Sequence, residues 1–236
     1  MKIIVLSAHP DDAETGTGGL CARASNAGHE VLIVHLSREV RNNKINGISE
    51  AKIRTLEGKK AAKILGVQVE FLDYYMGEFS ATVESSKVIE DIIRKNKPDI
   101  VLTQWPVDSH PDHQVVGILP IRPYIWHQKF CIGFYEVYTG IQTIIFQPNR
   151  YVDISDFVEQ KRKSILVHKS QNPERQVEMH EKMSVYRGLE TGCEHAEAFH
   201  ILGRGTKTAF DELFDDTRYY KQSGGMKALG FPKCTE

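Results

Sequence analysis

Hydrophobic positions in the first hundred residues follow two alternating patterns. Short, mostly apolar runs are typical of buried strands, and they occur at Ile3–Leu6, Val31–Leu36, Val69–Leu72 and Ile100–Gln104. Apolar residues at helical spacing separate these runs and predict helices over Gly18–Ala27, Ser49–Leu65 and Val83–Asn96. Strands spaced by helices of this length predict right-handed βαβ units. We therefore predict an α/β fold with a Rossmann-like, mostly parallel sheet that is flanked by helices.

The pattern is less regular in the second half of the chain. Strands are predicted at Cys131–Tyr138, Thr143–Phe146 and Tyr151–Ile154. A turn at Gly140 separates the first two of these strands. A helix capped by Ser155 or Asp156 is predicted to reach about Val167, and a last long helix to span Pro173–Leu189.

Composition narrows the class of protein. Hydrophobic residues make up 41% of the chain and charged residues 26%, with a net charge of −1, which is typical of a globular domain and gives no basic excess for nucleic acid. No apolar run approaches the roughly 20 residues that span a bilayer, so we expect no membrane insertion. The four cysteines form no C-x-x-C pair and predict free thiols in the cytoplasm. We expect a single domain over residues 1–236, with its core at about 1–200 and a tail at 201–236.

Two polar motifs follow predicted strands, at the point where each strand ends. His9–Glu14 comes directly after the first strand, and Ser109–His113 follows the strand that ends near Gln104. Ligands of open α/β sheets bind outside the carboxyl ends of the strands. The two motifs together supply three histidines, three aspartates and one glutamate, which suits a divalent metal.

The spacing within the motifs separates ligands from catalytic groups. His9 and Asp12 can converge on one ion from a strand-to-helix turn, and His113 is a suitable third ligand. A fourth position then remains for water. Asp11 would lie beside that water, where a general base is needed. His110 would point into the same pocket, where a protonated imidazole can stabilise an oxyanion or protonate a leaving amine.

Other interpretations compete with a metal-dependent hydrolase. Each motif alone could be a helix cap or a solvated loop. Two histidines and a carboxylate also suit a non-haem iron oxygenase. Hydrolysis of another amide or ester bond, including a phosphoester, stays open, as does a non-catalytic nucleotide-binding module. Gly16–Gly19 resembles a phosphate-binding loop, but its spacing is not G-x-G-x-x-G, so we expect a tight turn and close helix–sheet packing. We expect structural or exposed roles for the remaining histidines: His29, His35, His127, His168, His180 and His200.

The two motifs point to a known family. Ala8–Glu14 together with His110–His113 resembles the LmbE-like, or PIG-L, superfamily of zinc-dependent de-N-acetylases. Further segments are similar to later family patterns: Arg54–Glu57 with Ala61, Ala62, Leu65 and Gly66; Asp153 and Ile154 with Lys161, His168, Ser170 and Gln171; and Ala196–Phe199. The resemblance implies the LmbE-like fold over about residues 1–200 and hydrolysis of an N-acetyl group.

The resemblance also implies a separate role for each residue around the metal. One zinc per chain, with Fe²⁺ as the other possibility, would be bound by His9, Asp12 and His113. Asp11 would be the general base. His110, oriented by Asp112, would assist the tetrahedral intermediate and the leaving amine.

The resemblance defines the substrate and the residues that bind it less closely than the metal ligands. The family implies a small N-acetylated amino sugar or conjugate, such as an N-acetylglucosamine derivative. Glu14 would lie at the pocket edge, and Arg54 would contact a substrate hydroxyl or anionic group unless it is a surface helix arginine. His195 stands where the family often has a tyrosine and would be a third substrate-binding residue. The polar loop Arg38–Ile48 would influence substrate choice or be disordered, and Pro123–Trp126 could serve the core or a homo-oligomer interface.

Overall fold

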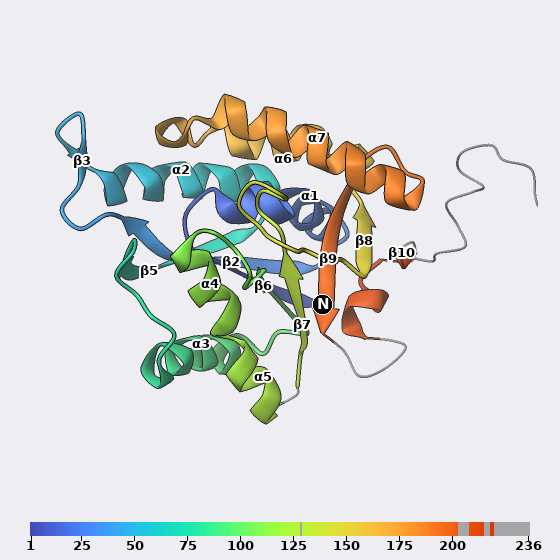
Figure 1. The fold of residues 1–236 in the computed structure, drawn as a ribbon, viewed down its shortest axis with the longest axis horizontal. Coiled ribbons are helices and arrows are strands. Elements are labelled where there is room, and N and C mark those ends of the chain that lie inside the picture. The colour runs from blue at the N-terminus through green and yellow to red at the C-terminus, as the bar shows by residue number, and fades with distance from the viewer. Residues whose placement is uncertain (128, 203–207, 215–217, 220–236) are drawn as a thin grey trace, which may run out of the picture.

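The computed structural model describes residues 1–127, 129–202, 208–214 and 218–219. These residues form an eight-stranded sheet in the order β10-β8-β9-β7-β6-β1-β2-β5 (Figure 1). Strands β5, β2, β1, β6 and β7 are parallel to one another, whereas β9, β8 and β10 pair antiparallel at one side. Their bounds are β1 Lys2–Ser7, β2 Glu30–Glu39, β5 Gln68–Tyr75, β6 Ile100–Gln104, β7 Cys131–Tyr135, β8 Arg150–Asp153, β9 Ala196–Leu202 and β10 Arg218–Tyr219. The predicted α/β class with a mostly parallel sheet is confirmed.

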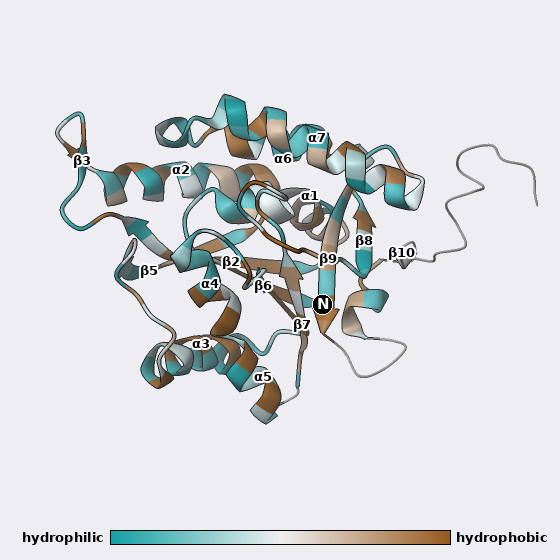
Figure 2. Ribbon diagram, viewed as in Figure 1, coloured by the Kyte–Doolittle hydropathy of each residue, from teal (hydrophilic) through white to brown (hydrophobic). Residues whose placement is uncertain are grey.

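Helices cover both faces of the sheet (Figure 1). One layer holds α1 Asp12–Asn26, α2 Glu50–Leu65, α6 Val158–Leu166 and α7 Pro173–Thr191. The other layer holds α3 Val83–Asn96, α4 Pro111–Ile118 and α5 Ile121–His127. Along β1, Ile3 and Val5 join one buried cluster and Ile4 and Leu6 the other, because successive side chains point to opposite faces of a strand. The central strands are therefore apolar on both faces, as their brown colour in Figure 2 shows.

Several predicted elements differ from the structure. Helix α1 begins at Asp12 rather than Gly18, so the glycine-rich segment lies inside the helix and forms no turn. A Cβ at Gly16 would lie 2.4 Å from the Tyr135 ring, and one at Gly19 would lie 2.6 Å from Ile154. The predicted tight turn at Gly16–Gly19 is therefore wrong, whereas the predicted close packing of this segment is confirmed. Thr143–Phe146 is not a strand, since only isolated bridges form at Thr143.

Other elements were not predicted at all. Strand β9 is a central member of the sheet, and α4 and α5 fill the segment between β6 and β7. The polar loop after β2 contains a small hairpin, β3 Lys44–Ile45 and β4 Ile48–Ser49. Its turn residues Asn46 and Gly47 have φ of 50° and 80°, as a tight two-residue hairpin turn requires.

The C-terminal tail predicted at 201–236 lies largely outside the described residues. Within the described part, a 3₁₀ helix, Ala209–Glu212, buries Phe210 against the core. No helix in the described part of the chain has both the length and the apolar character needed to cross a membrane.

Candidate metal centre

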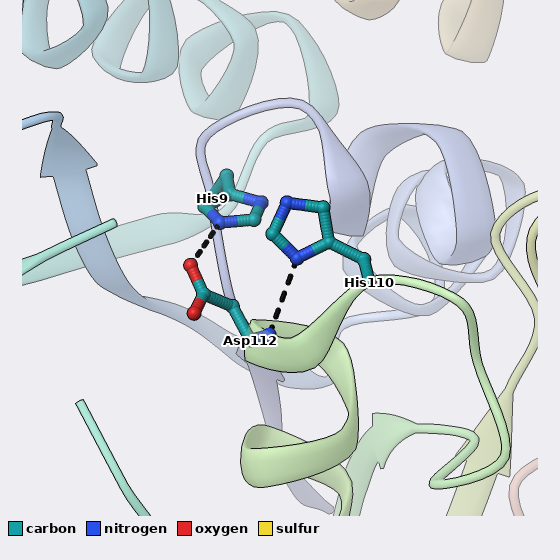
Figure 3. Close-up of side chains that lie close together, drawn as sticks. All are labelled: His9, His110 and Asp112. Atoms are coloured by element: carbon teal, nitrogen blue, oxygen red, sulfur yellow. Dashed lines mark hydrogen bonds and ion pairs between the residues drawn. The ribbon is translucent and has the colours of Figure 1, made fainter. Parts of the chain in front are cut away.

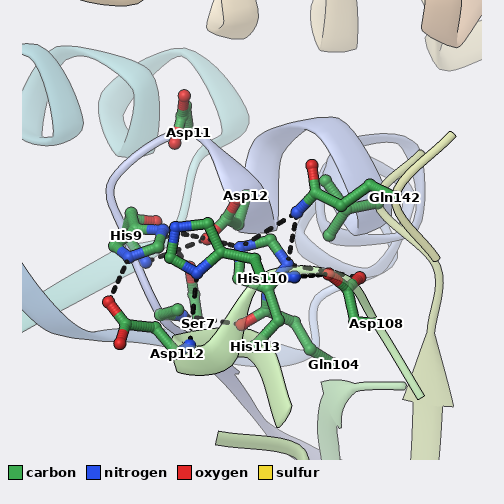
Figure 4. Close-up of polar contacts among 12 residues, drawn as sticks. Ser7, His9, Asp11, Asp12, Gln104, Asp108, His110, Asp112, His113 and Gln142 are labelled. Carbon is green, nitrogen blue, oxygen red and sulfur yellow. Dashed lines mark hydrogen bonds and ion pairs between the residues drawn. The ribbon is translucent and has the colours of Figure 1, made fainter. Parts of the chain in front are cut away.

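The two polar motifs meet at the carboxyl edge of neighbouring strands, as predicted. β1 and β6 pair in parallel, so the turn from β1 into α1 lies beside the loop from β6 into α4. His110 is the N-cap of α4, and Pro111 occupies its first turn, where the missing N–H costs nothing. His113 lies in the first turn of α4 and faces the turn between β1 and α1, which spans residues 8–11 and is called the β1 loop below (Figure 4).

His9, Asp12 and His113 form a buried cluster. Asp12 Oδ2 lies 3.1 Å from His9 Nδ1 and 3.3 Å from His113 Nε2. Their three candidate ligand atoms lie within 4.8 Å of one another. Two imidazoles and one carboxylate are the donor set of many catalytic divalent metal sites. The cluster could therefore hold a metal ion, and its chemistry fits the predicted ligand set.

The charges in the cluster favour a bound cation. Burial alone would raise the pKa of Asp12, but His113 and His9 hold this pKa well below its usual range. Burial alone would lower the pKa of His113, yet Asp12 and Asp108 raise it to about 10. These shifts favour an ionised Asp12 carboxylate and a protonated His113 imidazole facing it. A divalent ion would take the place of the His113 proton, so that metal binding would release it.

The carboxylate of Asp112 lies against His9, not against His110. Its Oδ2 is 3.0 Å from His9 Nε2, and both of its oxygens accept from the Gly77 N–H at 2.9 and 3.1 Å. Figure 3 shows this contact within a second group of possible metal ligands, His9, His110 and Asp112. A metal-binding histidine usually donates its other N–H to a carboxylate, which sets its tautomer and orientation. Asp112 therefore contacts His110 through its backbone N–H, whereas the hydrogen bonds of its carboxylate among the described residues go to His9 and Gly77.

His110 is held by the main chain instead. Its Nδ1 accepts from the backbone N–H of Asp112 at 3.2 Å, which leaves the proton of a neutral ring on Nε2. The ring stacks on His113 with centroids 4.7 Å apart. Burial and then the neighbouring His9 and His113 lower the pKa of His110. The environment therefore favours a neutral hydrogen-bond donor rather than the protonated imidazole expected from sequence.

Asp11 stands apart from the contacts that join the cluster (Figure 4). It is the N-cap of α1 and has a φ of 120°, a conformation that non-glycine residues rarely adopt. Its Oδ2 accepts from Gln176 Nε2 at 2.8 Å, and its Oδ1 lies 3.4 Å from Arg54 Nη2. Burial and then the adjacent Asp12 raise the pKa of the Asp11 carboxyl, which makes its ionised form a stronger base.

Arg54 is buried beneath the β1 loop rather than exposed on its helix. Only 1% of its surface is accessible, and its Nη2 donates to the Pro10 carbonyl at 2.8 Å. The surface-arginine interpretation is thus wrong. The guanidinium contacts Asp11 and Glu50, so the contacts it makes in this structure are to the protein itself.

Glu14 is buried rather than at the pocket edge that the resemblance implied, and His195 contacts α7. Glu14 is fully buried, and its Oε1 lies 3.8 Å from His35 and 3.5 Å from His168. It is therefore a core residue and not a pocket-edge residue. His195 Nδ1 lies 2.9 Å from Ser184 Oγ of α7, and its N–H donates to Ser155 Oγ, so its substrate-binding role stays a prediction.

Sequence reasoning missed three polar residues at the site. Asp108 Oδ2 lies 3.4 Å from His113 Nδ1, and its Oδ1 accepts from the His110 N–H at 2.8 Å. The Gln142 side chain lies 2.8 Å from the same His113 nitrogen, and Gln176 reaches Asp11 from α7. Of these three residues, only Asp108 is close to one of the two motifs in sequence, so only Asp108 could have been predicted as a site residue from its position.

Comparisons with known proteins agree with this geometry. Residues 4–121 match the family model described as GlcNAc-PI de-N-acetylase, PIG-L. A diacetylchitobiose deacetylase from Thermococcus kodakarensis is 31% identical over 229 residues, covering 85% of this chain and 83% of the relative. The chain belongs to the PIG-L family. The membership expected from the two motifs is therefore confirmed.

Solved structures of other proteins share the fold of this PIG-L member. The N,N'-diacetylchitobiose deacetylase from Pyrococcus horikoshii has a TM-score of 0.74 and 29% identity, covering 90% of this chain and 88% of that one. GalB, the 4-carboxy-2-hydroxymuconate hydratase from Pseudomonas putida KT2440, has a TM-score of 0.75 at 23% identity, covering 88% and 98%. The second likeness concerns the fold alone, and it shows that this architecture also occurs in a protein with a different named activity.

Proposed function

We propose that this protein is a zinc-dependent hydrolase that removes the acetyl group from an N-acetylated amino sugar. The observation that carries the proposal is the buried cluster of His9, Asp12 and His113, with Asp112 on the far nitrogen of His9. Relatives named as diacetylchitobiose deacetylases support the N-acetylglucosamine class of substrate. Zinc is proposed because the set of two imidazoles and one carboxylate, with one position left for water, is typical of catalytic zinc, and Fe²⁺ is the alternative.

His9, Asp12 and His113 would hold the ion, which would supply a water of lowered pKa and a Lewis acid for the acetyl carbonyl. Asp11 accepts the proton of the attacking water. The Nε2–H of His110 donates to the carbonyl oxygen as negative charge develops there, an interaction typically worth about 3–4 kcal/mol. Asp11 then returns its proton to the departing nitrogen. Acetate and the free amine are the products, so one water is consumed for each amide bond broken.

The remaining inferences rest on the sequence. We propose one domain over residues 1–236, a small-molecule substrate, and a cytoplasmic location. A homo-oligomer stays a prediction: Trp126 of α5 is 70% exposed, whereas Pro123 of the same helix is buried.

The test is acetate release by the metal-loaded protein. The panel should contain N-acetylglucosamine, diacetylchitobiose and an N-acetylglucosaminyl inositol, with metal content measured on the same preparation. We expect about one metal per chain and acetate release from at least one member. His9→Ala should lose both the metal and the activity.

His127→Ala is the matched control. This histidine lies on α5 and pairs with Glu90, away from the cluster, so its loss should leave metal and turnover unchanged. Full metal loading without acetate release from any member would overturn the proposed activity. Release that survives the loss of His9 would overturn the metal centre.

A further inference from the structure

The corner between α6 and α7 connects a distant part of the chain to the proposed base. His168, Ser170 and Gln171 in this corner belong to a segment that resembles a later family pattern, and the resemblance implies no catalytic or binding role for them. In the structure a short 3₁₀ helix, Lys169–Gln171, turns the chain from α6 into α7. The first turns of α7 then carry Gln176 toward the β1 loop.

Two contacts hold this corner in place. The backbone N–H and the hydroxyl of Ser170 both donate to the carboxylate of Glu57 in α2, at 2.9 and 2.6 Å. His168 is fully buried, and its Nε2 lies 3.5 Å from Glu14 Oε1 in α1. The corner is thus anchored to α1 and α2, the two helices that flank the β1 loop, and the position of Gln176 follows from those anchors.

Gln176 completes the surroundings of the Asp11 carboxylate. Its Nε2 donates to Oδ2 at 2.8 Å, while Arg54 approaches Oδ1 at 3.4 Å. Each carboxylate oxygen therefore faces one donor from a different helix, which restricts rotation of the side chain. The second amide atom of Gln176, Oε1, is buried and has no hydrogen-bond partner among the described residues. The hydrogen bond of this amide is thus directed to the Asp11 carboxylate.

The backbone of Asp11 also needs external support. Its φ of 120° is strained for a residue with a side chain. Glu14 Oε2 accepts from its N–H at 3.2 Å, and Arg54 donates to the preceding carbonyl. Strain of this kind persists only where the surrounding structure holds it. Helices α1 and α2 thus anchor the α6–α7 corner and also hold the backbone of Asp11, whose side chain contacts Gln176.

We propose that Gln176 is a positioning residue for Asp11, presented by the α6–α7 corner and acting on the reaction only through the Asp11 carboxylate. This inference rests on the proposed function, in which Asp11 is the general base. Gln176 touches no reacting atom. It holds the Asp11 carboxylate in the orientation in which it accepts the proton of the attacking water.

The test is a double-mutant cycle between Gln176→Leu and Asp11→Ala in the full-length, metal-loaded protein. With Asp11 present, Gln176→Leu should lower kcat by about 10–100-fold, the usual effect of losing a partner of an active-site group, with KM within about twofold. With Asp11→Ala, the same substitution should change the residual kcat by less than about twofold, because its target is gone. An equal loss in both backgrounds would show a general structural effect and overturn the inference.

A matched control is Gln160→Leu. Gln160 of α6 also donates one hydrogen bond to a neighbouring helix, but its acceptor is the Ile64 carbonyl of α2, at 2.6 Å, and not a group of the β1 loop. Its loss should lower the unfolding midpoint without changing kcat. A kcat loss as large as that of Gln176→Leu would overturn the specific role of Gln176.

A second readout does not depend on activity. The same four proteins of the cycle are unfolded thermally, and the contact predicts that Gln176→Leu lowers Tm more in the presence of Asp11 than in its absence. Additive Tm shifts would overturn the inference whatever the enzyme acts on. Non-additive shifts in a protein that releases no acetate would instead overturn the proposed function and leave the Gln176–Asp11 coupling standing.

Discussion

Asp112 offers the sharpest test of how the metal centre is built. In the structure its carboxylate orients His9 by a 3.0 Å contact to Nε2, whereas His110 takes its hydrogen bond from the main chain. Asp112→Ala removes the carboxylate that fixes the tautomer and the direction of His9, a proposed metal ligand. Loss of such a partner typically lowers metal affinity by about 10–100-fold. Since each tenfold change corresponds to about 1.4 kcal/mol, the expected loss in binding free energy is about 1.4–2.7 kcal/mol.

The same substitution has a smaller effect on the fold. The carboxylate also accepts from the Gly77 N–H, so its removal leaves that donor without its partner. A lost hydrogen bond of this kind costs about 0.5–1.5 kcal/mol of unfolding free energy. Asp112→Asn keeps an acceptor oxygen but removes the charge, and it should therefore fall between the wild type and Asp112→Ala in metal affinity.

Metal affinity is best measured by competition with a chromophoric chelator, with Tm recorded at saturating metal. Asp91→Ala is the control, because Asp91 forms an exposed ion pair with Lys87 on α3. Affinity within about twofold of the wild type, combined with a large fall in kcat, would refute the reasoning. That result would mean that Asp112 acts through His110, as the sequence resemblance implied.

Three further predictions concern packing, pH and metal. Gly19→Ala should lower the unfolding free energy by about 1–3 kcal/mol in urea titrations, because the new methyl group would lie 2.6 Å from Ile154; an unchanged value would contradict the close packing. Burial alone would raise the pKa of Asp211, but Arg150 and neighbouring donors hold it below its ordinary value. The stability that this carboxylate provides is present above its unfolded pKa of about 3.9 and is lost as pH falls through the lower folded pKa. The gap in unfolding free energy between wild type and Asp211→Asn should therefore be widest near pH 7 and shrink in acid, and a constant gap would refute the ion pair as its cause. Zinc at about 100 times its Kd should stabilise the fold by about 2.7 kcal/mol and raise Tm, and His113→Ala should abolish this rise.

The amino-acid sequence by itself determined the architecture and the location of the site. Apolar runs between helical patterns predicted β1, β2, β5 and β6, and α3 has the bounds that were predicted for it, Val83–Asn96. Parallel strands bring their carboxyl ends to one edge of the sheet, so two motifs that follow such strands are brought together even though a hundred residues separate them. The meeting of His9, Asp12 and His113 followed from that rule and from the preferences of metal ligands.

Tertiary structure alone decided which groups surround those residues. The sequence placed Asp112 two residues from His110, but its carboxylate extends to His9 across the gap between two loops. It also could not reveal that Glu14 and Arg54 are buried beneath the β1 loop, because polar side chains in the first turns of helices are usually solvated.

The contact between Gln176 and Asp11 could not be predicted from any local sequence pattern. It stands 165 residues from Asp11, and its direction depends on how α6 and α7 pack against α1 and α2. Strand and helix periodicity specify which face of an element is apolar, since this depends only on neighbours along the chain. The hydrogen-bond partner of a polar side chain depends on packing between distant segments, and that information is present only in the folded structure.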